Sequence, residues 1–207
     1  MKDKLSIIKI GGNVVNSPTE LNLFLKDFAA LEGYKILVHG GGKIASEISA
    51  SMGLEPKMSG GRRITDEQTL NVVTMVYAGL LNKKIVSKLQ AFNCNAIGLS
   101  GADGDGIRAH KRKVKDLDYG FAGDVDEVGS AMIESLLRSG LSPVFCAITH
   151  DKKGQLLNTN ADTIASELAK GLSDEFDVEL LYCFEKDGVL EDVENEDSVV
   201  EHIDARK

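Results

Sequence analysis

Short apolar runs alternate with segments of helical periodicity along most of this 207-residue chain. Each run is long enough for one buried strand, and each intervening segment repeats its apolar residues at the spacing of one helix face. The predicted strands are residues 5–10, 35–39, 95–99, 143–148 and 178–183, and the predicted helices are residues 18–31, 42–52, 66–92, 127–139 and 160–171. This alternation predicts an open, mainly parallel α/β sheet with helices on both faces, a three-layer αβα sandwich.

Local signals at the ends of the helical segments agree with this pattern. Ser17 precedes a proline and is a typical cap for a helix that begins at the next residue. Thr65 and Gln68 have the spacing of a capping box, so we expect Thr65 to cap the long helix that follows it. Gly53 and Gly140 each close a helical segment, where a residue in the left-handed conformation is common.

Two segments rich in glycine and charge, residues 54–65 and 107–125, interrupt the alternation. We expect each of them to form a hairpin over the carboxyl ends of the strands, where ligands bind in open α/β sheets. Hydrophobic residues make up 43% of the chain and aromatic residues only 5%, so we expect a core of Ile, Leu, Val and Ala. Such a core suits a parallel sheet that is covered on both faces.

Charge and composition argue against several classes of protein. A net charge of −8 disfavours general affinity for nucleic acid, which needs a clustered positive surface. The sequence shows neither a long apolar run nor a charged-then-apolar leader, so we expect no membrane span and a cytoplasmic location. Cys94, Cys146 and Cys183 are expected to be buried thiols, and no His or Cys pair has metal-ligand spacing. We therefore expect any metal to arrive with a substrate.

A lysine inside an apolar run is the first candidate site residue. Lys9 lies in IIKIGGNVV, and a charge within a buried strand is costly unless an anion pairs with it. Three predicted strands end in glycine-rich turns, at Gly11-Gly12, at Gly40–Gly42 and at SGADGDG, residues 100–106. Glycine turns let backbone N–H groups approach an anion closely. Together these features indicate a polyanionic substrate at one edge of the sheet.

Two common phosphate-binding motifs match the Gly40–Gly42 turn only in part. A P-loop requires a glycine where Leu37 stands and a hydroxyl residue where Ile44 stands. The turn does match the dinucleotide fingerprint G-x-G-x-x-A, which ends at Ala45. Residues 60–63, however, lack the acidic residue expected about 20 positions further on. A dinucleotide site therefore remains an alternative at this point.

The string NTNADTIASELA, residues 158–169, adds a polar cluster at a predicted helix start. Capping needs only one of Asn158, Asn160 and Asp162, so the others indicate a polar site. Arg63, in the first predicted hairpin, adds a second cation to the lysine of the first strand. We expect the ammonium of Lys9 to face this edge of the sheet, within a side chain's length of Asp162.

Six strings resemble, in order and in spacing, those of the N-acetylglutamate kinases of the amino-acid kinase family. They are IIKIGGNVV, ILVHGGGKIASEI, SGGRRIT, LNKKIV, GLSGADGD and GQLLNTNADTIASELA. The resemblance implies a sheet of the carbamate kinase-like type. It also implies transfer of the γ-phosphoryl group of ATP to the side-chain carboxylate of N-acetyl-L-glutamate, the second step of arginine biosynthesis, with Mg²⁺ held mainly by the nucleotide.

The same resemblance implies roles for ten residues. Lys9 would stabilise the phosphoryl group in transfer, and Asp162 would orient the catalytic lysines. The acyl-glutamate site would be formed by Gly41, Gly42, Arg63 and Asn158, and the nucleotide contacts by Gly11, Gly12, Glu185 and Gly188. The last two lie in CFEKDGVL, a modified form of the family's loop S-D-V-x-G-V-L.

The chemistry agrees with these roles. Phosphoryl transfer needs the two substrates in line and positive charge beside the transferred group. A carboxylate acceptor is already ionised at neutral pH, so no general base is required. The planar fork of Arg63 matches the two oxygens of a carboxylate. Arg62 stands where the family usually has an apolar residue, and it is either a solvated charge or a contact for a longer anionic acyl group such as succinyl.

The family also has a second catalytic lysine, in a D-G-M-x-x-K segment that would follow position 207. We therefore expect residues 1–170 to form the acyl-glutamate lobe with a dimer surface, and residues 171–207 to begin a nucleotide lobe that is truncated. We expect the 207-residue chain itself to be poorly active. The arginine-inhibited hexamers of the family have an extra helix ahead of the first strand, which here begins by Leu5, so we expect a homodimer. Another amino-acid kinase and a catalytically silent metabolite-binding module remain as alternatives.

Overall fold

Five parallel strands form the central sheet of the protein. The computed structural model describes residues 2–115, 117–184, 188–192, 195 and 198–202. The strand order is β11 (Phe176–Cys183), β1 (Asp3–Ile10), β2 (Tyr34–His39), β8 (Ser142–Cys146) and β5 (Ala96–Leu99), and each neighbouring pair is parallel. The predicted open, mainly parallel sheet is therefore confirmed.

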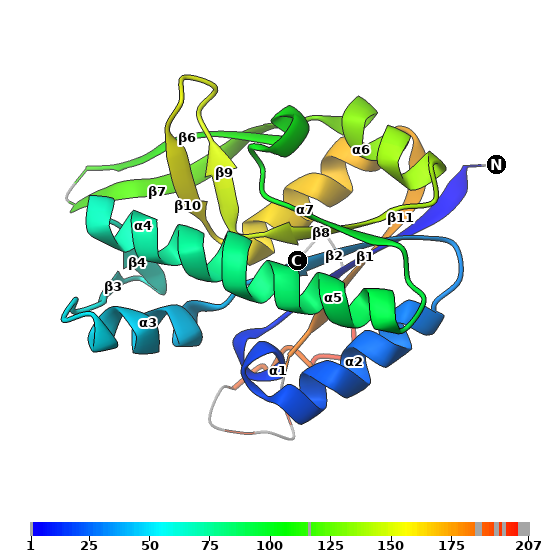
Figure 1. Ribbon diagram of the computed structural model, residues 1–207, viewed down its shortest axis with the longest axis horizontal. Coiled ribbons are helices and arrows are strands. Elements are labelled where there is room, and N and C mark those ends of the chain that lie inside the picture. Colours follow the sequence, from blue (N-terminus) through cyan, green and yellow to red (C-terminus); the bar gives the residue numbers. More distant parts are fainter. Residues whose placement is uncertain (1, 116, 185–187, 193–194, 196–197, 203–207) are drawn as a thin grey trace.

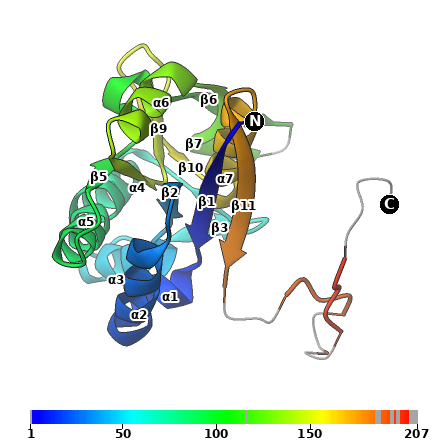
Figure 2. The same cartoon turned by 90° about the vertical axis from the view of Figure 1, so that its right-hand side faces the viewer.

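Helices cover both faces of this sheet, as Figures 1 and 2 show. Helices α2 (Pro18–Ala30) and α5 (Asn82–Ala91) pack together on one face, and α6 (Ser130–Arg138) and α7 (Ala161–Leu172) pack on the other. Because both faces are covered, the strands consist of nearly continuous apolar residues, and Ile7, Ile36 and Phe145 are fully buried. The three-layer sandwich predicted from the alternation is confirmed.

A second group of four strands stands at the carboxyl end of β8. Strands β6 (Ile107–Val114), β7 (Leu117–Val128), β9 (Ile148–His150) and β10 (Leu156–Thr159) pair with one another in a closed ring. The predicted hairpin 107–125 is thus present as β6 and β7. The prediction of one strand over residues 143–148 was wrong, because the chain leaves the main sheet after Cys146 and joins the ring at Ile148.

A short hairpin of β3 (Lys57–Ser59) and β4 (Arg62–Ile64) confirms the prediction for residues 54–65. It is attached to the ring, because Thr65 forms a β-bridge with Gly120 at the start of β7. A Cβ on Gly120 would lie 2.3 Å from the Thr65 carbonyl oxygen, so only glycine permits this close contact. The hairpin is therefore fixed at the edge of the sheet where the candidate site lies.

The predicted helix 66–92 is continuous but not uniform. It consists of α4 (Glu67–Thr74), the π-helical segment η1 (Met75–Leu81) and α5. The predicted cap was wrong: Asp66 caps α4, accepting from the Thr69 N–H at 2.8 Å, because Thr65 Oγ1 instead donates to the Arg63 carbonyl at 2.9 Å. A π-helical turn contains one more residue than an α-helical turn, and such segments are frequent at functional sites.

Two further helices begin at the glycine turns that follow β1 and β2. They are α1 (Gly12–Asn16), which was not predicted, and α3 (Gly42–Ser51), which was. Gly53 and Gly140 have φ angles of +76° and +77°, which confirms that they end helices in the left-handed conformation.

Cys94 and Cys146 are buried free thiols, and Cys183 is a partly buried one. No helix within the described ranges is both long and apolar enough to span a bilayer.

Candidate active site

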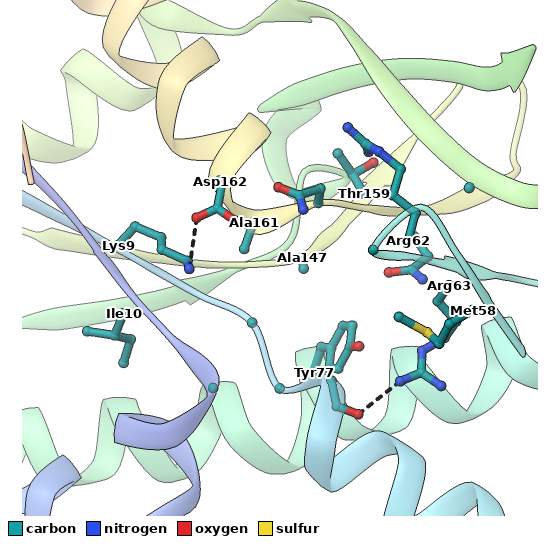
Figure 3. A pocket seen from close by; sticks show the side chains of 18 residues that line it. Lys9, Ile10, Met58, Arg62, Arg63, Tyr77, Ala147, Thr159, Ala161 and Asp162 are labelled. Atoms are coloured by element: carbon teal, nitrogen blue, oxygen red, sulfur yellow. Dashed lines mark hydrogen bonds and ion pairs between the residues drawn. The ribbon is translucent and has the colours of Figure 1, made fainter. Parts of the chain in front are cut away.

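A cavity of about 380 Å³ opens at the carboxyl ends of β1 and β2. Its volume suits a ligand of the size of an acylated amino acid. Seven of the ten predicted site residues line it, namely Lys9, Gly12, Gly41, Gly42, Arg63, Asn158 and Asp162. The cavity is therefore built from segments that lie far apart in the sequence and meet at one edge of the sheet (Figure 3).

Lys9 and Asp162 form an ion pair on one side of the cavity, with 2.8 Å between Nζ and Oδ1. Ile8 and Ile10 are buried in the core, whereas Lys9 extends towards the first turn of α7. Only 15% of the lysine side chain is exposed, against 51% for the aspartate. The predicted proximity of Lys9 and Asp162 at this edge is confirmed, and the pair leaves a cation facing the cavity (Figure 3).

The three polar residues of NTNAD have separate tasks. Asn160 caps α7, because its side chain accepts a hydrogen bond from the Thr163 N–H at 3.0 Å. Asp162 is consequently not needed as a cap and pairs with the lysine instead. Asn158, on β10, donates from Nδ2 to Thr65 Oγ1 at 3.0 Å. That bond ties the β3–β4 hairpin to the ring of strands beside the cavity.

Arg63 lies on the opposite side of the cavity and is only 7% exposed. Its Nη2 donates to the Gly42 carbonyl at 2.9 Å and to Ser46 Oγ at 2.8 Å. Nη1 is buried and has no hydrogen-bond partner among the described residues. Leaving such a donor unpaired costs about 1–3 kcal/mol, and more when it is charged. Arg63 also lines the cavity, so its guanidinium is a candidate partner for a carboxylate bound there.

Tyr77 is a wall of the cavity that the sequence did not indicate. It lies on η1 and is 5% exposed. Burial raises the pKa of its hydroxyl above the ordinary value, so the group remains protonated at neutral pH. In the sequence, Tyr77 has the helical spacing of a core residue, so the apolar pattern does not mark it as a site residue. In the structure it packs against the glycine turn: a Cβ on Gly41 would lie 2.3 Å from Leu81 Cδ1 and 3.1 Å from the tyrosine ring.

The four predicted nucleotide contacts, Gly11, Gly12, Glu185 and Gly188, do not all lie at the cavity. The Gly11 N–H donates to the Cys183 carbonyl at 2.9 Å, so it is not available to a phosphate, and the prediction for this amide was wrong. Gly12 does line the cavity. Gly188 does not, because it lies beside Val199, and Glu185 lies outside the described residues. The nucleotide contacts of the last two stay predictions.

No group of three or more His, Cys, Asp or Glu side chains in the described part of the chain is arranged to hold a metal ion. Among the residues that the structure describes, the cavity is lined by one carboxylate, Asp162, and that carboxylate is already paired with a lysine. The charges presented by this part of the protein are therefore mainly positive, as suits phosphate and carboxylate groups.

A parallel sheet with a lysine, glycine turns and a buried arginine at the ends of its strands defines a protein that binds anionic substrates. The chain belongs to the amino acid kinase family, whose model matches residues 4–207. The acetylglutamate kinase of Phocaeicola vulgatus is 58% identical to it over 200 residues, which cover 97% of this chain and 78% of that protein. The acetylglutamate kinase of Bacteroides fragilis is 56% identical over 203 residues, 98% of this chain and 78% of that protein.

Solved structures share this fold. The crystal structure of smu.665 from Streptococcus mutans superposes with a TM-score of 0.74 at 24% identity, over 90% of this chain and 75% of that one. The resemblance found in the six strings is thus confirmed, and it replaces the dinucleotide-binding alternative drawn from the Gly40–Gly42 turn.

Proposed function

We propose that this protein transfers the γ-phosphoryl group of ATP to the side-chain carboxylate of N-acetyl-L-glutamate. The observation that carries the proposal is one cavity with the Lys9–Asp162 pair on one side and Arg63 on the other, whose Nη1 has no hydrogen-bond partner among the described residues. The relatives named acetylglutamate kinase, at 54–58% identity, support the same reaction. Its product, an acyl phosphate, belongs to arginine biosynthesis.

In the proposed mechanism, a carboxylate oxygen of the acceptor attacks the γ-phosphorus while the bond to the β–γ bridging oxygen breaks and ADP leaves. The acceptor is ionised at neutral pH, so no residue has to remove a proton. The ammonium of Lys9 offsets the negative charge on the transferred group, and Asp162 holds that ammonium in place at 2.8 Å. Arg63 binds the α-carboxylate of the acceptor through its free nitrogen.

The nucleotide side of the reaction completes the proposal. ATP would carry Mg²⁺ on its own phosphate oxygens, since the described residues offer no cluster of metal ligands. The amide of Gly12 would face the phosphates from the end of β1. Residues 1–170 would hold the acceptor, and the segment from residue 171, with Glu185 and Gly188, would hold the nucleotide. Strand β11 in that segment pairs with β1 along its whole length, so the two parts share one sheet.

A longer acyl acceptor, N-succinyl-L-glutamate, is the second candidate, and Arg62 is the observation that favours it. Arg62 lines the cavity, and its Nη1 lies 4.0 Å from Asp124. Arg112 already pairs with that aspartate at 2.8 Å, so Arg62 keeps capacity for another anion. Turnover of N-acetyl- and N-succinyl-L-glutamate by the wild type and by Arg62→Leu tests this candidate. A loss of turnover confined to the succinyl substrate supports it, and unchanged turnover of both substrates in Arg62→Leu rejects it.

We also propose a cytoplasmic homodimer that associates through the exposed side of the long helix. Met75 is 55% exposed and Leu80 38% exposed on η1, and a Cβ on Gly79 would meet no atom within 4 Å. Exposed apolar side chains gathered around an uncovered glycine suit contact with a second copy. In Figure 1 the helix runs across the front of the molecule.

Trapping of the product with hydroxylamine tests the reaction directly. The full-length protein, ATP, Mg²⁺ and N-acetyl-L-glutamate should give the hydroxamate of the acyl phosphate, and free L-glutamate, aspartate and carbamate should give little. Formation of ADP without hydroxamate, or faster reaction with an unacylated amino acid, would reject the proposed acceptor.

A further inference from the structure

A histidine that no step of the proposed mechanism uses lies directly under the glycine turn. His39 is the last residue of β2 and is fully buried. Its Nδ1 lies 2.8 Å from the Gly40 carbonyl oxygen, and its Nε2 lies 3.2 Å from Nδ2 of Asn82, the first residue of α5. Both ring nitrogens are therefore hydrogen-bonded, one of them to the turn that lines the cavity.

The direction of each hydrogen bond follows from groups that can only donate or only accept. The ammonium of Lys83 donates to Asn82 Oδ1 at 3.1 Å and to the Gly98 carbonyl at 3.0 Å. Nδ2 of Asn82 therefore donates, to the Val144 carbonyl at 2.9 Å and to Nε2 of His39. The histidine must carry its proton on Nδ1 and donate it to Gly40. Burial lowers the pKa of His39 to about 4, which keeps the ring neutral.

This arrangement fixes the peptide that joins Gly40 and Gly41. In a trans peptide the C=O and the N–H point in opposite directions. Because the imidazole holds the Gly40 carbonyl, the Gly41 N–H points away from the core, and Gly41 lines the cavity. Within the described part of the chain, no backbone oxygen accepts a hydrogen bond from this N–H.

The Gly41 N–H also lies at the right place along the cavity. Lys9 is in register with Val38 on the neighbouring strand, and Gly42 accepts the hydrogen bond from Arg63. The turn thus runs between the lysine and the arginine. An acyl-glutamate whose α-carboxylate binds Arg63 and whose side chain extends to Lys9 would place its reacting carboxylate over Gly41.

The sheet leaves a space for this network. A Cβ on Gly98 of β5 would lie 1.9 Å from Asn82 Oδ1 and 2.8 Å from Lys83 Nζ, so the asparagine fits only because that residue is a glycine. The π-helical segment ends at Leu81, directly before Asn82, and packs Leu81 against Gly41. Helix and strand are therefore both adapted to the same contact.

We propose that His39 and Asn82, which are buried, and Lys83, which is exposed, form a hydrogen-bonded relay whose task is to aim the Gly41 N–H at the reacting carboxylate of the acceptor. The inference rests on the proposed function. His39 is a positioning residue in it, since it acts through the Gly40–Gly41 peptide and does not touch the substrate.

Nitrogen NMR of the labelled full-length protein tests the relay apart from activity. At neutral pH the His39 ring should show a protonated Nδ1 and an unprotonated Nε2. Addition of N-acetyl-L-glutamate should shift the Gly41 amide proton. The opposite tautomer, or a charged ring, would overturn the relay. Absence of any binding of N-acetyl-L-glutamate by the wild type would reject the proposed function. The tautomer of His39 would still show whether the relay exists.

Kinetics of three variants test its effect. His39→Asn keeps a donor in reach of the Gly40 carbonyl and should retain most of the activity. His39→Leu removes the donor and should lower kcat/KM roughly 100-fold, mainly through kcat, as misplacement of a reacting group does. Val38→Ala, the fully buried neighbour on β2, is the matched control for loss of packing alone. Equal kinetics in His39→Asn and His39→Leu, or an equal kcat loss in Val38→Ala, would overturn the proposal.

Discussion

At the scale of single residues, the site depends on which charges are satisfied by the protein and which are not. Lys9 has a carboxylate partner at 2.8 Å, whereas Arg63 has one nitrogen bonded to the protein and one without a hydrogen-bond partner among the described residues. In the proposed mechanism the lysine acts on a charge that develops during the reaction, and the arginine binds a charge that is present throughout.

The two cations should consequently differ in their kinetic effects. We expect Lys9→Ala to lower kcat roughly 100- to 1000-fold with little change in the KM for N-acetyl-L-glutamate, because it removes charge stabilisation in the transition state. We expect Arg63→Ala to raise that KM roughly 10- to 100-fold, the value of a charge-assisted hydrogen bond. Arg63→Lys should restore little, since an ammonium lacks the planar fork. Steady-state kinetics with the effects exchanged between the two residues would contradict the assignment.

His39 should make the stability of the protein depend on pH. Burial lowers its pKa to about 4, against 6.5 for an ordinary histidine. Between these values the unfolded chain binds a proton that the folded protein does not, so the free energy of unfolding falls as the pH falls from 6.5 to 4. The total loss is about 3 kcal/mol.

Urea denaturation at several pH values measures this effect. The wild type should lose more stability than His39→Asn across that window, whereas Val38→Ala should be less stable than the wild type by the same amount at every pH. Parallel curves for the wild type and His39→Asn would show that the histidine is not buried in the neutral form.

At the scale of elements, the glycine turn after β2 is defined by the helix packed against it. Gly41 has a φ angle of +155°, and Leu81 and Tyr77 of η1 fill the space where a side chain would stand. The π-helical segment thus sets the shape of the cavity as much as the turn does.

Alanine at Gly41 should therefore impair the site. We expect Gly41→Ala to weaken binding of N-acetyl-L-glutamate at least tenfold, since the turn must move away from Leu81. Gly53→Ala is the matched control, because Gly53 also has a positive φ angle, +76°, but a Cβ there would meet no atom within 4 Å. Calorimetry should show normal binding by the control; equal weakening in both variants would mean that backbone strain alone is responsible.

The sequence predicted the elements of the main sheet well and the rest less well, for physical reasons. Strands buried on both faces are continuous apolar runs, and these stand out in any window. The run 143–148 is also continuous, so nothing in it shows that the chain changes sheets after Cys146. Likewise Thr65 and Asp66 are both good caps, and only the tertiary bonds of Thr65 decide between them.

The same distinction applies to the site. Lys9 was predictable because a charge in an apolar strand needs a partner, and Arg63 because a cation stood in a loop expected over the strand ends. Tyr77 and Asn82 were not, because on a long amphipathic helix their spacing is that of core residues. Their contacts with the glycine turn and with His39 depend on the π-helical register, which the apolar pattern does not reveal.

At the scale of the whole molecule, the long helix separates the site on one side from an exposed apolar surface on the other. Tyr77 faces the cavity, whereas Met75 and Leu80 are exposed. If two copies associate through this surface, the element that shapes the acceptor site is also the element that joins the subunits.

A charge on that surface should separate the copies. We expect the wild type to have the mass of a dimer in light scattering and Met75→Glu to have the mass of a monomer, because burying an unpaired carboxylate in an apolar interface is unfavourable. Leu23→Glu is a control on the outer side of α2, where the side chain is 59% exposed. A wild type with the mass of a monomer or hexamer, or loss of the dimer in the control alone, would contradict the proposed interface.

Calorimetric titration of N-acetyl-L-glutamate into the wild type, Arg63→Ala and Lys9→Ala tests the proposed site directly. We expect binding by the wild type, nearly unchanged binding by Lys9→Ala, and a dissociation constant raised roughly 10- to 100-fold in Arg63→Ala. Equal affinity in all three proteins would contradict the claim that this cavity holds the acceptor between the arginine and the lysine.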